Sequence, residues 1–561
     1  MTCTTLAPYS SSVLTTCASN AIARSFRNSI LFGDLGVYFF FGRTLPWADD
    51  TAPPDASLNY QDVWDTRNDM VHIRKVRDAE NSWVIPYNPW TNGVVYDRYD
   101  PTYSVSNPAF SRANSLAAAN MFVLTSENHI YKCIDNDRNA ASIVEPSGTS
   151  TDYIETGDGY VWKYMMTLSD VQISKFLSAD WMPIKNAIQA SSNFANDGIH
   201  RGNIRVVTGG TGYSYDNTVI TVVGDGVGCE LKPIIDAGVI TGVEVIDNGL
   251  DYTFANVTVS SPDGNLPLGG GASIAVDFEP VDFNNTLIER QINTQLNAVC
   301  GDLSSLELLT PGAGYTQPPT VKVVGDGTGA EVGVIMAGDQ TIDNIYIISR
   351  GSGYTYMNLE FVSTPGTVST PATARAIVSP SCGHGGDIVE ESCANTLGFW
   401  ATTQEEYNQG MLTTCDYRQI GLMVAPNRIS CYGGIKTNKE YTSSIGAATY
   451  YVGSVDIAAN DYAEDMIVIK KNAANEDVEY AVVAYEDNQL LLQSLTGIGI
   501  EERDVFFDTA GVQKFTVGSV TPPEFDKFSG SVLYYENREP FRTPYKPGAE
   551  STVIFRTYLT F

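Results

Sequence analysis

Basic residues are scarce in this 561-residue sequence. Lysine and arginine number 34 against 65 aspartates and glutamates, which gives a formal net charge of −31 at pH 7. Nucleic acids and anionic lipid surfaces are held largely by Lys and Arg contacts to phosphate. The charge balance therefore argues against both of these partners and favours protein or cation partners, while it says little about the fold.

Long apolar runs are also missing. No segment approaches the ~20 apolar residues that span a bilayer, and the longest aromatic run, residues 37–41, has the length of a strand. The first twenty residues lack the basic start and apolar centre of a signal peptide. We therefore expect no membrane insertion and no export signal of the chain's own.

Paired cysteines and metal-ligand spacings are absent as well. The nine cysteines are an odd number without any CxxC pair, which fits thiols kept reduced in a cytoplasm. Cys382, His384 and Cys393 give three soft ligands close together, and a fourth would have to come from Cys415 or Cys431. Structural zinc sites usually show paired ligand spacing. We therefore predict a plain loop, no metal and no cofactor.

Residues 135–139 begin like a calcium-binding loop but do not continue as one. Asp135-Asn-Asp-Arg-Asn139 places oxygen atoms at positions one, three and five of such a loop. Position six is Ala140 where the loop needs glycine, and position twelve is Pro146 where it needs glutamate. An Asx-rich turn is the better interpretation.

The sequence is rich in patterns typical of β-strands. Hydrophobic residues make up 43% and charged residues 18%, and the length exceeds that of one compact core, so three or four structural units are expected. Residues 16–30 carry apolar side chains at spacings of three and four, which predicts one amphipathic helix. From Gly36 onward, short β-branched and aromatic runs alternate with Gly, Pro, Asn and Asp. The predicted fold class is mainly β, with several sandwich-like or barrel-like units.

The middle of the chain carries an internal repeat rich in glycine and tyrosine. Four short motifs end in tyrosine, and their glycines predict tight turns with positive φ; the turn residues are Gly212, Tyr213, Tyr252, Gly314, Tyr315, Gly353 and Tyr354. A second motif, Gly-Asp-Gly-x-Gly, follows the first and third tyrosine motifs. The spacing predicts a duplicated β module within 201–380, with copies at 204–280 and 306–380.

The Gly-Asp-Gly-x-Gly motifs have two chemical interpretations besides a turn. Glycine-rich turns can direct backbone N–H groups at a phosphate, but neither motif is followed by Lys-Ser or Lys-Thr and neither has a strand-loop-helix setting. A calcium site that uses Asp225 or Asp326 is slightly better supported than phosphate binding, but it is still the minority interpretation. We predict β-turns, and whether an acidic cluster binds calcium stays open.

Enzyme signatures are weak. Gly383-His-Gly-Gly386 is similar to the oxyanion loop of esterases, yet no Gly-x-Ser-x-Gly elbow supplies a nucleophile. Carboxylates are abundant, but no pair is singled out as a glycosidase pair. We therefore predict no catalytic residues.

Four segments, taken in order, carry a family resemblance. They are Phe40-Phe-Gly-Arg-Thr-Leu-Pro-Trp47, Glu155-Thr-Gly-Asp-Gly-Tyr-Val-Trp162, Tyr417-Arg-Gln-Ile420 and Ser529-Gly-Ser-Val-Leu-Tyr-Tyr-Glu-Asn-Arg-Glu-Pro540. Together they resemble the wedge-subunit family of T-even-like phage baseplates, the small dimeric protein that joins neighbouring wedge components. The motif residues are Phe41, Gly42, Arg43, Pro46, Trp47, Gly157, Asp158, Gly159, Tyr160, Trp162, Arg418, Gln419, Tyr535, Glu536, Asn537, Arg538 and Pro540.

The resemblance implies a virion protein of a contractile tail, made and assembled in the host cytoplasm. It further implies other baseplate wedge proteins and a second copy of the chain as partners. The expected organisation is a wedge body over 1–200, the repeat insert over 201–380, the body continued over 381–449, a small β insertion over 450–520 and a C-terminal hairpin over 521–561. The two inserts have no counterpart in the smaller family members.

Two other functions compete with a wedge scaffold. A host-receptor or saccharide-binding tail protein is suggested by the repeat tyrosines, whose rings could stack on sugars. A tail-associated hydrolase is the third hypothesis. For the motif residues themselves, burial of the large aromatic rings and pairing of the arginines make a role in the fold more common than partner contact.

Overall fold

The computed structural model describes residues 11–32, 36–77, 80–185, 199, 204–214, 218–224, 226–250, 255–261, 269–276, 286–363, 368–402, 416–429, 435–443, 445–457, 461–463, 466–486, 488–541 and 554–561. The predicted fold class is confirmed: antiparallel sheets dominate and helices are few. The N-terminal helix, α1 (Ser11–Phe32), is longer at both ends than the predicted 16–30. Among the described residues, no helix is both long and apolar enough to cross a membrane.

The chain forms two compact units, each built from distant parts of the sequence. Unit 1 contains the described parts of 1–24, 82–397 and 559–561, and unit 2 those of 25–81 and 398–558. Four elements cross the boundary along the chain: α1, β3 (Asn81–Pro86), β21 (Thr396–Thr402) and β35 (Ile554–Thr560).

Unit 2 centres on a five-stranded antiparallel sheet in the order β25-β2-β1-β22-β34. Its strands are β1 (Val37–Gly42), β2 (Met70–Lys75), β22 (Tyr417–Val424), β25 (Ile445–Ala447) and β34 (Ser531–Phe541). All six residues of β1 are buried, as expected of a central strand covered on both faces, which explains the continuous aromatic run. Helix α2 (Tyr60–Asp69) precedes β2 and begins at Asn59, whose side chain accepts a hydrogen bond from the Asp62 N–H.

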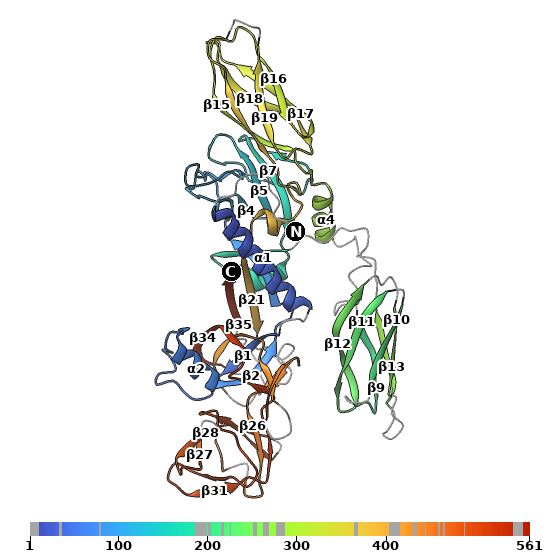
Figure 1. Ribbon diagram of the computed structural model, residues 1–561, viewed down its shortest axis with the longest axis vertical. Coiled ribbons are helices and arrows are strands. Elements are labelled where there is room, and N and C mark those ends of the chain that lie inside the picture. Colours follow the sequence, from blue (N-terminus) through green and yellow to red (C-terminus); the bar gives the residue numbers. More distant parts are fainter. Residues whose placement is uncertain are drawn as a thin grey trace. The chain divides into compact units, whose positions relative to one another are not determined.

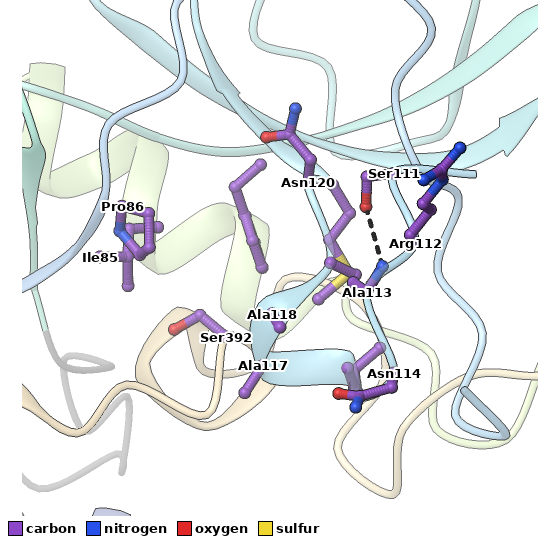
Figure 2. A pocket seen from close by; sticks show the side chains of 14 residues that line it. Ile85, Pro86, Ser111, Arg112, Ala113, Asn114, Ala117, Ala118, Asn120 and Ser392 are labelled. Atoms are coloured by element: carbon purple, nitrogen blue, oxygen red, sulfur yellow. Dashed lines mark hydrogen bonds between the residues drawn. The ribbon is translucent and has the colours of Figure 1, made fainter. Parts of the chain in front are cut away.

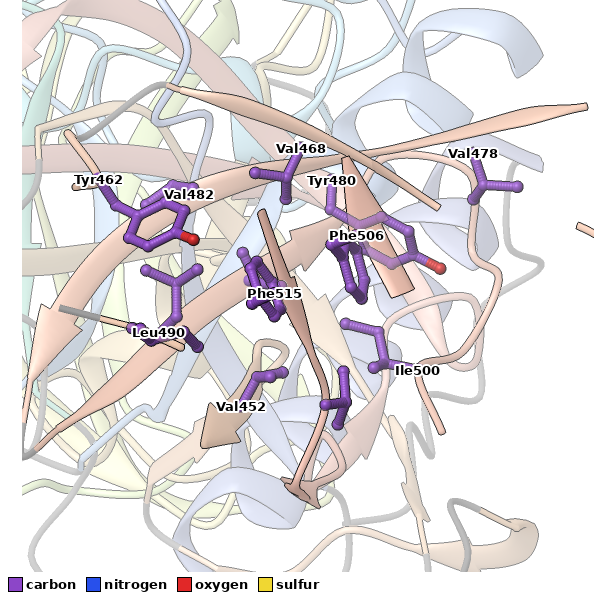
Figure 3. Packing of buried hydrophobic residues seen from close by; sticks show 13 residues of the cluster. Val452, Tyr462, Val468, Val478, Tyr480, Val482, Leu490, Ile500, Phe506 and Phe515 are labelled. Atoms are coloured by element: carbon purple, nitrogen blue, oxygen red, sulfur yellow. The ribbon is translucent and has the colours of Figure 1, made fainter. Parts of the chain in front are cut away.

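A second sheet in unit 2 has seven strands in the order β31-β30-β27-β28-β29-β26-β32. Their bounds are β26 (Tyr450–Gly453), β27 (Ile467–Lys471), β28 (Asp477–Glu486), β29 (Gln489–Ser494), β30 (Val505–Phe507), β31 (Gln513–Thr516) and β32 (Ser519–Thr521). The two edge strands are consecutive in sequence, separated by Val517 and Gly518, so the sheet curls toward closure. Figure 3 shows its apolar interior, where the Phe506 and Phe515 rings stack with centroids 4.9 Å apart. A small sheet, β24-β23-β33, completes the unit: β23 (Asn427–Ile429), β24 (Lys436–Glu440) and β33 (Phe525–Asp526).

Unit 1 contains a four-stranded sheet in the order β4-β5-β7-β6 and the pair β3–β8. The elements are β4 (Phe122–Leu124), β5 (His129–Asn136), β6 (Ile154–Glu155), β7 (Tyr160–Thr167), β8 (Trp181–Ile184), the 3₁₀ helix η2 (Leu116–Ala118), α3 (Asp170–Phe176), α4 (Thr286–Leu296) and α5 (Ile388–Glu391). Ser169 and Gln172 form a reciprocal capping box that begins α3.

The Gly/Tyr-rich segment of unit 1 forms two modules with one pairing scheme (Figure 1). The first comprises β9 (Ile204–Thr211), β10 (Val219–Gly224), β11 (Val227–Asp236), β12 (Val239–Leu250), β13 (Ala255–Ser260) and β14 (Gly270–Val276); the second comprises β15 (Leu303–Thr310), β16 (Thr320–Gly325), β17 (Thr328–Met336), β18 (Ile342–Ser352), β19 (Met357–Val362) and β20 (Thr373–Val378). In each, the first strand pairs with the sixth, the second with the fifth and the third with the fourth. A duplication accounts for this shared scheme.

The C-terminal hairpin needs correction. We predicted a C-terminal hairpin over 521–561, but β34 pairs with β22, and β35 lies beside β21 in another sheet. Each strand therefore finds a partner strand far away in sequence, which a local pattern cannot reveal. Strand β34 joins the sheet that contains β1.

Candidate functional site

Three of the four motif segments meet on adjacent strands of unit 2. Gly42 on β1 lies opposite Gln419 on β22, which in turn lies opposite Asn537 on β34. The Gln419 amide donates to the Asn537 side-chain oxygen over 2.8 Å. We call this region the motif cluster: residues 41–50, 69, 418–419 and 535–540.

Arg418 anchors the first segment to β22. Its guanidinium is 5% exposed and makes a bidentate pair with Asp50, in which Nε and Nη2 each lie 2.9 Å from a carboxylate oxygen. A third bond goes to the Thr44 carbonyl. The hydrogen bond from Arg418 is the main cause that lowers the pKa of Asp50 below its usual value. Such paired, planar contacts fix both geometry and charge.

Arg43 makes the second ionic anchor. Its Nη1 lies 2.8 Å from Asp69, and its guanidinium stacks 3.7 Å from the centroid of the Trp47 ring. Burial raises the pKa of Asp69, and Arg43 opposes that shift. The neighbouring glycine is required because a Cβ on Gly42 would lie 2.4 Å from the Asp69 carbonyl oxygen.

Segment 529–540 joins the cluster through a contact with Trp47 of the first segment. The Trp47 indole N–H donates to the Arg538 carbonyl over 3.2 Å. Tyr535 donates its hydroxyl to the Ser57 carbonyl over 2.7 Å, and Asn537 donates to the Pro54 carbonyl over 2.9 Å. The remaining motif side chains are placed as follows: Phe41 is fully buried, Glu536 contacts the Arg538 guanidinium, the Pro46 carbonyl accepts from Arg43, and Pro540 is exposed.

The remaining motif segment, residues 155–162, lies in unit 1 and includes the turn that joins β6 to β7. Gly159 has φ +85°. Burial acts to raise the pKa of Asp158, but hydrogen bonds from Thr156 and from backbone N–H groups outweigh it and lower that pKa. Tyr160 and Trp162 are buried and stack with centroids 5.3 Å apart. Gly157 is exposed in the turn. The contacts of this segment are therefore local ones within unit 1, whereas the motif cluster belongs to unit 2.

The repeat tyrosines are core residues. Tyr213, Tyr315 and Tyr354 are 5%, 2% and 7% exposed, and each hydroxyl accepts a hydrogen bond from the backbone N–H of an alanine. The turn glycines have positive φ, namely Gly212 at 82°, Gly314 at 86° and Gly353 at 77°. Tyr252 lies outside the described residues. A buried ring has no free face on which a sugar could stack. At these three positions the repeat tyrosines therefore do not support saccharide binding.

Asp326 and Asp135 are engaged in turns. Both Asp326 oxygens accept hydrogen bonds, from the Thr355 N–H over 2.8 Å and from its hydroxyl over 2.6 Å. Asp135 accepts from the Asp137 N–H over 3.1 Å, as in an Asx turn. Asp225 lies outside the described residues. Within the part of the chain that the structure describes, no group of three or more His, Cys, Asp or Glu could hold a metal ion.

A buried polar cluster, which the sequence analysis missed, ties β5 to α5 and β15. Lys132 Nζ lies 2.7 Å from Glu391 Oε2 and 3.0 Å from His384 Nδ1, while His384 Nε2 lies 2.8 Å from Ser304 Oγ. All four side chains are at most 5% exposed. Burial raises the Glu391 pKa, but Lys132 outweighs it and lowers that pKa to about 2; burial lowers the His384 pKa to about 4. Of these four residues the sequence had pointed only to His384, as a candidate metal ligand and as part of the glycine-rich 383–386 loop.

The serine, histidine and glutamate of this cluster are similar to a hydrolase triad in distance but not in proton placement. His384 Nδ1 lies 3.5 Å from Glu391 Oε2, but the Lys132 ammonium, which only donates, is closer at 3.0 Å, so Nδ1 is better placed as an acceptor with the ring proton on Nε2. That N–H then donates to Ser304 Oγ, whereas a nucleophile needs a base at this position. The contacts of this cluster tie β5, β15 and the segment around α5 together within unit 1.

One pocket of about 530 Å³ opens beside η2 in unit 1 (Figure 2). Small side chains line it, among them Ala117, Ala118 and Ser392, and Arg112 is the only ionisable residue of its lining. Buried Asp97 holds both ends of the lining loop, because its carboxylate accepts from the N–H groups of Ser111 and Asn120. Without a second titratable group, the pocket offers no acid–base pair.

Comparison of the chain with protein-family models and with curated proteins finds no match in either.

Proposed function

We propose that this protein is a structural subunit of a contractile phage tail baseplate wedge that links neighbouring wedge subunits. The observation that carries the proposal is the meeting of motif segments 40–47, 417–420 and 529–540 on adjacent strands. Segments that matched the family only by chance would have no reason to lie side by side in the fold. Their convergence is what a common body with variable inserts would produce.

The chemistry of these residues also supports assembly over catalysis. Arg43 and Arg418 each pair with an aspartate, and the Trp47 indole is bonded to backbone. Such contacts build a rigid body on which partner surfaces can be held, and multivalent scaffolds act through large, partly obligate interfaces. As a wedge protein the chain would be assembled in the host cytoplasm and carried in the virion tail, with a second copy and other wedge proteins as partners.

Reconstitution tests this function. The purified chain is mixed with the other wedge proteins of its phage, and analytical ultracentrifugation measures the masses formed. We expect a homodimer alone and a defined larger complex in the mixture. A chain that stays apart from every wedge protein, yet binds host cells or degrades cell-wall polymer, would replace this proposal with one of the two competing functions.

A further inference from the structure

Unit 2 presents an aromatic ladder at the start of α2. The ladder consists of Tyr60, Trp64 and Phe528: the first two rings stack with centroids 6.2 Å apart, and Trp64 lies 4.7 Å from Phe528. Tyr60 is 81% exposed and Trp64 is 40% exposed, and Leu58, just before the helix, is 62% exposed. Residues four apart share one face of a helix, so Tyr60 and Trp64 form a continuous stripe.

The contact of α2 with the core of unit 2 is made by a different residue. The inner side of α2 is supplied by Val63, which packs against the core of Tyr38, Phe40 and Met70. Contiguous exposed aromatic surface on a soluble unit usually marks an interaction site. Trp and Tyr are also the residues that contribute most to binding when a partner covers them.

The residues that flank the ladder in sequence include three carboxylates. Asp55, Asp62 and Asp65 form no ion pair with any described residue. The nearby cations are already engaged, because Arg67 donates to three backbone carbonyls and Lys436 pairs with Asp526 over 3.0 Å. The ladder is therefore an apolar stripe beside carboxylates that have amide partners, Asn59 for Asp62 and Gln61 for Asp65, but no cation among the described residues.

We propose that the α2 aromatic ladder is a docking surface for an amphipathic segment of a partner protein, with apolar side chains on one side and Lys or Arg on the other. The partner's apolar side would cover Tyr60 and Trp64, while its cations would meet Asp55 and Asp65. This deepens the proposed function by naming the kind of partner segment, and it rests on that function only in taking protein binding as the protein's role.

Two other occupants fit less well. An anionic membrane would be repelled by the three carboxylates. A saccharide would have only the Tyr60 ring to stack on, because the Trp64 ring already contacts both Tyr60 and Phe528. Peptide segments bind by laying apolar side chains along such a stripe.

A pair of model peptides tests the surface. One is a helical peptide of leucine and lysine, and its counterpart replaces every lysine with glutamate; binding to the full-length chain is measured by calorimetry. We expect the lysine peptide to bind at least about tenfold more tightly, with affinity falling as salt rises because exposed charges are screened. Trp64→Ala should weaken binding about tenfold, and Asp55→Asn combined with Asp65→Asn should remove most of the salt dependence.

The controls separate docking from folding. Tyr60→Ala removes the most exposed ring of the ladder and should weaken binding without changing the melting temperature. Phe110→Ala, which removes a 56% exposed ring in unit 1, should change neither. Equal binding of both peptides, or undiminished binding by Tyr60→Ala and Trp64→Ala, would overturn the inference. Because no wedge protein is present, that failure is distinct from a failure of wedge reconstitution.

Discussion

Replacing Lys132 by methionine should be among the most destabilising single changes in unit 1. The ammonium is 0% exposed and Glu391 2% exposed, so the variant leaves a buried carboxylate without its counter-charge. Removing one partner of a buried pair costs about 3–5 kcal/mol. We expect a loss of about 3 kcal/mol at pH 7, because the Gly385 N–H still donates to Glu391 over 2.7 Å.

The double variant Lys132→Met/Glu391→Gln supplies the internal comparison. It removes both charges, and the Gln oxygen can still accept from Gly385, so we expect it to recover most of the lost stability. Urea unfolding, followed by hydrogen exchange of peptides from β5, reports on unit 1 separately from unit 2.

The pH dependence provides a second signature. In the parent chain the pKa of Glu391 is lowered to about 2, so its stabilising contribution is present above pH 4.5 and is lost as pH falls toward 2. In Lys132→Met, burial still raises the pKa of that carboxyl, while the main group that lowers it is gone and only His384 and the Gly385 N–H remain. Acidification from pH 8 to 5 should therefore reduce the deficit. Equal losses in the single and double variants, or a deficit independent of pH, would refute this account.

Three further predictions follow from the geometry. Arg418→Lys loses the bidentate contact and should lower the unfolding free energy of unit 2 by about 1–3 kcal/mol in urea titrations; an unchanged midpoint would contradict that role. Gly327→Ala would place a Cβ 2.4 Å from the Tyr354 ring and should cost about 1–3 kcal/mol, whereas the control Gly338→Ala, with no atom within 4 Å, should be neutral in the same assay. Burial lowers the pKa of His72 to about 4, so its neutral form is favoured in unit 2 and stability should fall by about 3 kcal/mol as pH drops from 6.5 to 4; His72→Phe should lose this part of the pH dependence, and a retained slope would assign it to other groups.

The fold class was predictable because its signals are local. Alternating β-branched runs, the spacing of apolar residues in 16–30 and the recurrence of glycine before tyrosine each act over short distances. The repeat glycines are also explained locally, since the tyrosine ring packs directly over them; a Cβ on Gly312, for example, would lie 2.7 Å from Tyr315.

The candidate site was predictable only in part. Motif resemblance selected Arg418 and Trp47, but their partners Asp50 and the Arg538 carbonyl carry no recognisable pattern. The Lys132–Glu391 pair joins residues 259 positions apart, and a lone lysine on a strand normally predicts an exposed side chain. Tertiary packing, absent from any short window, decides such contacts. The hairpin error has the same origin, because β34 and β35 are both paired over long range.

The crossing of the chain between the two units has a consequence for synthesis. The indole of Trp47 donates a hydrogen bond to a carbonyl 491 positions later in the chain. The ribosome therefore needs roughly 25–100 s to synthesise the chain from the first of these residues to the second. During that interval β1 can pair with β2, which follows closely, while the edge that awaits β22 stays open and apolar. Nascent chains stopped before residue 417 would expose that edge to neighbouring chains. Yield in a heterologous host should therefore depend on chaperone supply and translation speed more than on the stability of the finished protein.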